Sequence, residues 1–103
     1  MESDWKKFSA VLPRLREKYL AMRNAEVMAV FAASNRSETE RFWDAMGKME
    51  KEAKVLRLCL DDHSRSKMKL HILSMIRVGM LTREDLAEFS DELQKELSYA
   101  FSE

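Results

Sequence analysis

Glycine and proline are scarce in this chain of 103 residues, which contains two glycines and one proline. Average usage of these two residues is roughly 12 per cent, or about a dozen in a chain of this length. So few turn-forming residues exclude a sandwich, a barrel or a doubly wound sheet, because each of these folds needs many tight turns. Hydrophobic residues make up 46% of the chain and charged residues 35%, which is not the composition of a disordered protein. We therefore expect one helical domain over residues 1–103.

Cysteine, long apolar runs and an excess of one charge are also lacking. Cys59 is the only cysteine, so an intramolecular disulfide is excluded, and a lone thiol is typical of a reducing compartment. No apolar run approaches the ~20 residues that span a bilayer, and the start of the sequence does not resemble a signal peptide. These absences predict a cytoplasmic protein with no membrane partner. The 18 basic and 18 acidic side chains cancel, whereas dedicated nucleic-acid binders carry a basic excess.

The charges are unevenly distributed near the C-terminus. Residues 63–81 hold four basic side chains and no acidic one, whereas residues 82–103 hold two basic and seven acidic side chains. Two consecutive antiparallel helices would bring these segments side by side, where they attract each other. The alternative interpretation is that the basic segment meets phosphates or an acidic partner.

Apolar residues recur at three- and four-residue steps near the N-terminus, which predicts a helix capped by Ser3. The stripe consists of Trp5, Phe8, Leu12, Leu15, Tyr19 and Met22. Pro13 interrupts it, so we expect a kink or a break near Leu12. A turn should follow residues 32–35, where apolar bulk is lost.

A second helix should begin after Ser37, since Ser37 and Glu40 have the spacing of a capping box. Its inner stripe is Phe42, Met46, Met49, Ala53, Leu56 and Leu60, and a second apolar face is Trp43, Val55, Leu58 and Cys59. Two apolar faces predict a central helix with neighbours on more than one side. We favour a break near Asp62 over one continuous helix that reaches residue 78.

The remaining residues predict a tight helical hairpin. Met68, Ile72, Met75 and Ile76 form its first stripe, Gly79 is a C-cap, and Thr82 with Asp85 opens the last helix. The buried side of that helix is Leu86, Phe89, Leu93, Leu97 and Phe101. The fold class is therefore all-α: an antiparallel bundle of three or four long helices, which we expect a homodimer to complete because long helices with two apolar faces finish their burial on a second copy.

Signatures of chemistry are few. The sequence has no glycine-rich phosphate loop, no nucleophile elbow and no cysteine pair for a metal. Cys59 and His63 share a helix face but supply only half of a tetrahedral zinc site, so we interpret Cys59 as core and His63 as a surface or capping residue. We expect no catalytic residue, no cofactor and no metal.

Two Arg-x5-His spacings are present, from Arg57 to His63 and from Arg65 to His71. This spacing resembles the motif of HEPN ribonucleases, which are small helical proteins that pair as dimers and cut RNA. A polar residue usually follows the arginine in that motif, and Ser66 makes Arg65/His71 the better match. The resemblance implies that His71 or His63 acts as an acid or base and that the arginine of the same motif holds a phosphate.

Three functions therefore remain, and we favour a non-enzymatic protein–protein interaction or regulatory module that self-associates and docks through a helix face. The interface candidates are Trp5, Phe8, Trp43 and Met46, with the charged segments selecting the partner. The alternatives are the HEPN-like ribonuclease and a nucleic-acid-binding regulator that uses segment 63–77. The basic patch of that regulator would be Arg65, Lys67, Lys69 and Arg77.

Overall fold

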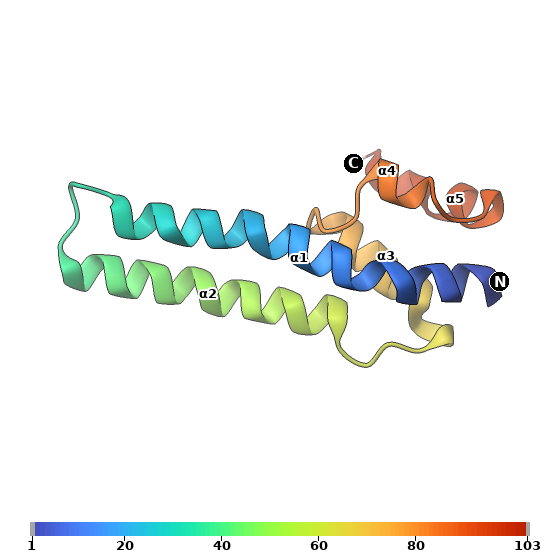
Figure 1. Cartoon of the computed structure of the whole chain (residues 1–103), viewed down its shortest axis with the longest axis horizontal. Coiled ribbons are helices and arrows are strands. Elements are labelled where there is room, and N and C mark those ends of the chain that lie inside the picture. The colour runs from blue at the N-terminus through green and yellow to red at the C-terminus, as the bar shows by residue number, and fades with distance from the viewer. Residues whose placement is uncertain (1, 103) are drawn as a thin grey trace.

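Helices make up all the regular structure of residues 2–102, the part of the chain that the computed structural model describes (Figure 1). The order is α1 (Glu2–Ala32), α2 (Glu38–Leu60), the 3₁₀ helix η1 (Arg65–Lys67), α3 (Met68–Arg77), α4 (Arg83–Leu86), α5 (Asp91–Leu97) and the 3₁₀ helix η2 (Ser98–Phe101). The all-α prediction is confirmed. The prediction of three or four long helices is wrong, because only α1 and α2, with 31 and 23 residues, are long.

Helix α1 runs through Pro13 without the break that the sequence predicts near Leu12. Pro13 is exposed, whereas Val11 and Leu15 on either side of it are buried. Because Pro13 has no N–H, the carbonyl of Ser9 lacks its helical donor, and on the exposed side of the helix this carbonyl is accessible to water. Core packing holds the helix on the opposite side. Ser3 lies inside the helix, which includes Glu2, so the predicted capping role of Ser3 is also wrong.

Helix α2 begins and ends as the sequence predicts. The Ser37 hydroxyl accepts a hydrogen bond from the Glu40 amide at 3.1 Å, and the Glu40 carboxylate accepts one from the Ser37 amide at 2.9 Å. The helix ends at Leu60, and Asp62 has a φ of 58°. Aspartate is one of the few residues that tolerate this left-handed conformation, so the break near Asp62 is confirmed.

The segment that follows α3 folds back against α1 and α3. Gly79, with a φ of 80°, ends α3, and the capping box of Thr82 with Asp85 opens α4, both as predicted. The single last helix is wrong, because Ser90 caps a separate helix α5 while its amide and hydroxyl bind Asp4 of α1 at 2.8 and 2.6 Å. Leu86, Phe89, Leu93 and Leu97 are nevertheless all buried, and Phe101 is half-buried.

The core occupies one end of an elongated molecule with extents of 52 × 26 × 20 Å. Its cluster of buried side chains comes from α1 up to Tyr19, from Cys59, and from α3, α4, α5 and the segments joining them. We call this part the core end. Residues 20–58 form the rest of α1 and α2, which we call the distal hairpin, and Ala45 is the only residue there that is buried.

Most of the distal hairpin extends beyond α3, α4 and α5, and its two helices run antiparallel there (Figure 1). Only its base, near Arg23 and Val55, contacts the core end. The prediction that α2 is a central helix is therefore wrong for its first half. Phe42, Met46 and Met49, expected on the inner stripe, are exposed, as is Met22 at the end of the predicted α1 stripe. Figure 1 shows the tip of the hairpin, where α1 ends and α2 begins, well away from α3, α4 and α5.

Candidate functional site

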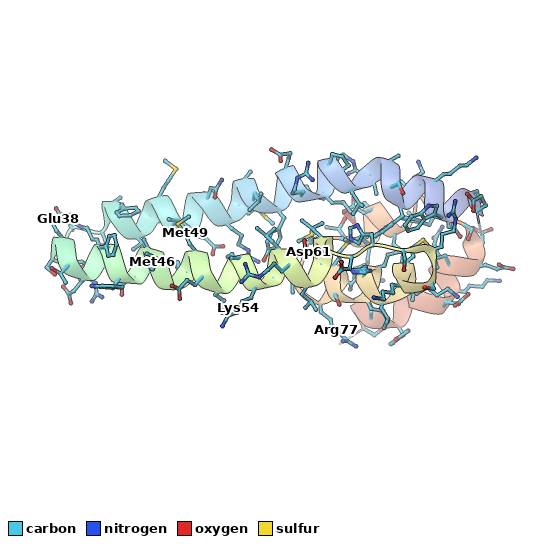
Figure 2. All side chains as sticks on the ribbon, turned by 90° about the horizontal axis from the view of Figure 1, so that it is seen from below. Glu38, Met46, Met49, Lys54, Asp61 and Arg77 are labelled. Carbon is cyan, nitrogen blue, oxygen red and sulfur yellow. The ribbon has the colours of Figure 1, made fainter. Side chains whose placement is uncertain are left out.

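Large apolar side chains gather on the surface of the distal hairpin. Met28 is 69% exposed and Trp43 63% exposed, values that are unusual for such residues when they have no contact role. The other large apolar side chains exposed on this part of the chain are Met22, Phe31, Phe42, Met46, Met49 and Leu58. Figure 2 shows Met46 and Met49 on the part of α2 that lies beyond the core end.

Most of these side chains share one side of the hairpin, which we call the apolar flank. Its members are Met28 and Phe31 of α1 and Phe42, Met46 and Met49 of α2. The three- and four-residue steps within each group place them on one face of their helix. Two hollows open on this flank. One of about 470 Å³ lies at the tip between Phe31, Phe42 and Trp43, and one of about 160 Å³ lies nearer the core end. The lining of the second includes Leu20, Val27, Met49, Ala53 and Leu56.

The opposite side of the hairpin carries ion pairs, and we call it the charged flank. Glu26 of α1 lies 3.6 Å from Lys48 of α2, and Arg36 in the turn pairs with Glu40 and Asp44. A hollow of about 390 Å³ on this side is lined largely by charged residues, Lys48 among them. Polar and apolar side chains are therefore sorted onto different flanks.

A polar cluster fixes the hairpin where it leaves the core end. The buried Tyr19 hydroxyl donates a hydrogen bond to the Glu52 carboxylate, and the Arg23 guanidinium lies 4.8 Å from the Tyr19 ring centre. Burial and the bond to Glu52 raise the pKa of Tyr19 above its ordinary value. A buried hydrogen bond between α1 and α2 at this level holds the two helices together, so the distal hairpin leaves the core end as a paired unit.

The predicted basic patch does not form one continuous surface. Arg65 makes two hydrogen bonds of 2.9 Å to the Glu2 carboxylate, and Lys69 lies 2.6 Å from Glu96. The bond to Glu2 raises the pKa of Arg65, and the same bond lowers the pKa of Glu2. Lys67 and Arg77 are exposed at opposite ends of α3. Two of the four cations are thus paired with carboxylates.

Among the described residues, the acidic side chains after Leu81 pair mainly with α1, and Glu96 alone pairs with the basic segment, at Lys69. Asp85 lies 3.0 Å from both Arg14 and Lys18, and Glu88 pairs with Arg14 and Lys7. Up to residue 102, the predicted attraction between the consecutive segments is therefore represented by one ion pair. Helix α1 supplies most of the counter-charges, which charge spacing along the sequence does not indicate.

Arg65 and His71 are engaged in separate contacts. His71 is 8% exposed, and its Nδ1 and Nε2 atoms each lie 3.0 Å from a backbone carbonyl oxygen, of Lys67 and Asp61 respectively. His63 stacks edge-on against it at 4.5 Å, and the His63 Nε2 atom lies 2.8 Å from the Cys59 carbonyl oxygen. In this arrangement the His71 ring holds the loop that follows α2, and neither of its nitrogens is open to a substrate.

Cys59 lies in the core with no exposed surface. Burial raises the pKa of its thiol to about 11, so the thiolate that nucleophilic chemistry or metal binding needs is scarce at neutral pH. Among residues 2–102 no three potential metal ligands of the histidine, cysteine, aspartate or glutamate type come together.

The four interface candidates are divided between the two parts of the molecule. Trp43 and Met46 are exposed on the distal hairpin, as the prediction requires. Phe8 is a correction, because it is fully buried at the centre of the core. Trp5 is half-buried beside Phe8, with the Arg65 guanidinium 5.5 Å from its ring centre.

The sequence analysis did not propose Met28, Phe31, Phe42 or Met49 as surface residues. A usable signal was present, because residues 21–33 contain only Arg23 and Glu26 as charged side chains. A helix paired with a single neighbour buries only one stripe, so a segment this poor in charge leaves apolar side chains outside that stripe.

None of the helices among residues 2–102 combines the length and the apolarity needed to cross a membrane. Comparison of the chain with models of protein families, with curated proteins and with solved structures gives no match.

Proposed function

We propose that the protein is a non-enzymatic helical protein–protein interaction or regulatory module that self-associates. The observation that carries the proposal is the contrast between the two parts of the molecule. All buried apolar side chains except Ala45 belong to the core end, whereas the distal hairpin keeps Met28, Phe42 and Trp43 exposed.

The free energy of burial favours a partner on the distal hairpin. Covering a large apolar side chain is worth about 1.5–3 kcal/mol relative to leaving it in water, and several such side chains lie side by side on the apolar flank. Helices owe most of their stability to packing of their apolar face. A partner that covers the flank would therefore stabilise both helices and the complex together.

The residues that could have supported chemistry support this proposal by their contacts. Cys59 is buried, both nitrogens of His71 lie against backbone carbonyl oxygens, and Arg65 is held by Glu2. These contacts stabilise the loop after α2 and its junction with α1, which is a structural use of all three side chains.

Light scattering over a range of concentrations tests the proposal. We expect the mass to rise from 12.1 kDa towards twice that value. A variant with Trp5→Phe keeps Trp43 as its only tryptophan, and acrylamide should quench its fluorescence less as the concentration rises. A mass of one chain at high concentration, with quenching that does not depend on concentration, would contradict self-association.

A further inference from the structure

We infer that the apolar flank is the contact surface of a symmetric homodimer, in which two distal hairpins lie antiparallel across a two-fold axis. This inference rests on the proposed function and names the partner as a second copy of this chain. The two hairpins would form a four-helix bundle, in which α1 faces the partner's α1 and α2 faces the partner's α2.

The spacing of the α2 stripe fits its own copy in the reverse direction. In an antiparallel pair of helices, residues whose numbers add to a constant lie opposite one another. Phe42 with Ala53 and Met46 with Met49 both add to 95. The largest side chain of the stripe would therefore meet the smallest, and the two methionines would meet each other, which fills the seam evenly.

The charges beside the stripe follow the same rule. Glu38 and Arg57 also add to 95, and both are exposed. The two-fold axis that pairs the apolar residues therefore brings Glu38 of one copy towards Arg57 of the other, twice in the dimer. Residues 20–58 carry seven basic and six acidic side chains, so two copies of the hairpin do not repel each other as strongly charged surfaces would.

The α1 side of the flank is compatible with the same axis. The ion pair between Glu26 and Lys48 puts these residues at one level of the hairpin, so an axis midway along the α2 stripe, between Gly47 and Lys48, crosses α1 between Glu26 and Val27. Leu20 and Phe31 lie on opposite sides of that point, about 10 and 7 Å from it at 1.5 Å per residue. Phe31 of one copy would therefore lie within one helical turn of Leu20 on the partner's α1.

The dimensions of the flank suit a stable dimer. Residues 38–56 of α2 extend over about 28 Å at 1.5 Å per residue, and two adjacent helices are roughly 20 Å wide. The outline is therefore on the order of 600 Å² per copy, and protruding side chains raise the accessible area towards the roughly 800 Å² that each partner buries in a typical interface. The antiparallel arrangement also places the two core ends at opposite ends of the dimer, where they do not collide.

Paired substitutions on the two flanks test which surface is used. Met46→Glu with Met49→Glu puts carboxylates into the proposed seam and should weaken dimerisation by at least about 100-fold. Lys48→Ala with Lys51→Ala, on the charged flank, changes the net charge by the same amount and should leave the dimer intact. All four residues are exposed in the chain, so both variants should fold, and circular dichroism checks this.

Disulfide trapping tests the direction and the register. Chains with Met46→Cys are mixed with larger, tagged chains with Met49→Cys and then oxidised. We expect the mixed disulfide to exceed either homodimeric product, and Phe42→Cys mixed with Met49→Cys to cross-link less. Cys59 is buried, so it does not compete for the introduced thiols.

The outcomes separate this inference from the proposed function. A wild-type dimer that persists in the Met46→Glu, Met49→Glu variant overturns the apolar flank as the interface but leaves self-association standing. Equal cross-linking in all mixtures overturns the antiparallel register. A wild-type chain that stays monomeric at every concentration overturns both the homodimer and self-association. This holds even if its apolar flank then binds lipid vesicles or another protein.

Discussion

Asp85 should make the stability of the protein depend on pH more than any other side chain of the core end. Asp85 is almost fully buried, closes the capping box of α4 and contacts both Arg14 and Lys18 at 3.0 Å. Burial alone would raise the pKa of its carboxyl group. The hydrogen bond from the Thr82 amide, followed by those from Lys18 and Arg14, outweighs burial and lowers the pKa from 3.8 to about 2.

This lowered pKa sets the size and the direction of the effect. A difference of nearly two units corresponds to about 2 kcal/mol of stability, at 1.36 kcal/mol per unit. Because the folded state holds the proton less tightly than the unfolded state, the contribution is complete above pH 4 and is lost as the pH falls towards 2. Asp85→Asn removes the charge, so we expect the free energy of unfolding of the variant at pH 7 to be lower than that of the wild type by about 2 kcal/mol. Between pH 4 and pH 2 the variant should lose less of its free energy of unfolding than the wild type does.

Urea unfolding followed by circular dichroism, at one protein concentration and at pH 7, 4 and 2, measures both quantities. Glu88→Gln is the matched control, because Glu88 also contacts Arg14 but is exposed, so its removal should cost less than about 1 kcal/mol. The reasoning fails if the wild type and Asp85→Asn lose the same free energy of unfolding between pH 4 and pH 2.

Three further outcomes are expected. The Asp4→Ala variant should have a free energy of unfolding in urea that is lower by about 2–3 kcal/mol. The reason is that the Ser90 amide and hydroxyl lose a shared buried acceptor. A decrease under 0.5 kcal/mol would show that this contact does not stabilise the fold. Cys59 should react with a thiol reagent only at the rate at which the core opens, owing to its burial and raised pKa, whereas immediate reaction in native buffer would disprove this. The Lys67→Glu, Lys69→Glu double variant should elute from a heparin column at the same moderate salt concentration as the wild type. If the wild type is retained and the double variant is not, the nucleic-acid alternative is favoured.

Local signals in the sequence predicted much of the fold. The capping boxes of Ser37 and Thr82, the left-handed turn at Gly79 and the break near Asp62 all depend on neighbours within a few residues, and all are present. The split of the last helix at Ser90 depends instead on Asp4, 86 residues away. Spacing within one helix carries no information about a contact of that kind.

The candidate site was only partly predictable, because the spacing of an apolar stripe does not show which segment covers it. The stripe that contains Phe42 and Met46 has the same spacing as the stripe that contains Leu86 and Leu93, yet the first is exposed and the second is buried. Periodicity shows that a stripe needs cover, but it does not show whether the same chain supplies it. Trp43 and Met46 were therefore found as candidates, whereas Phe8 was wrongly grouped with them.

The small amount of buried surface in residues 20–58 bears on how this chain can vary. Ala45 is the only fully enclosed side chain in that stretch. Deleting about seven residues, or two turns, from each of α1 and α2 there would shorten the distal hairpin without removing a side chain of the core end. In descendants of such a sequence the core end therefore sets no limit on the length of the hairpin, and the only limit comes from the contact surface proposed above. Their first nineteen residues, and those from Cys59 onward, are not free to differ in the same way.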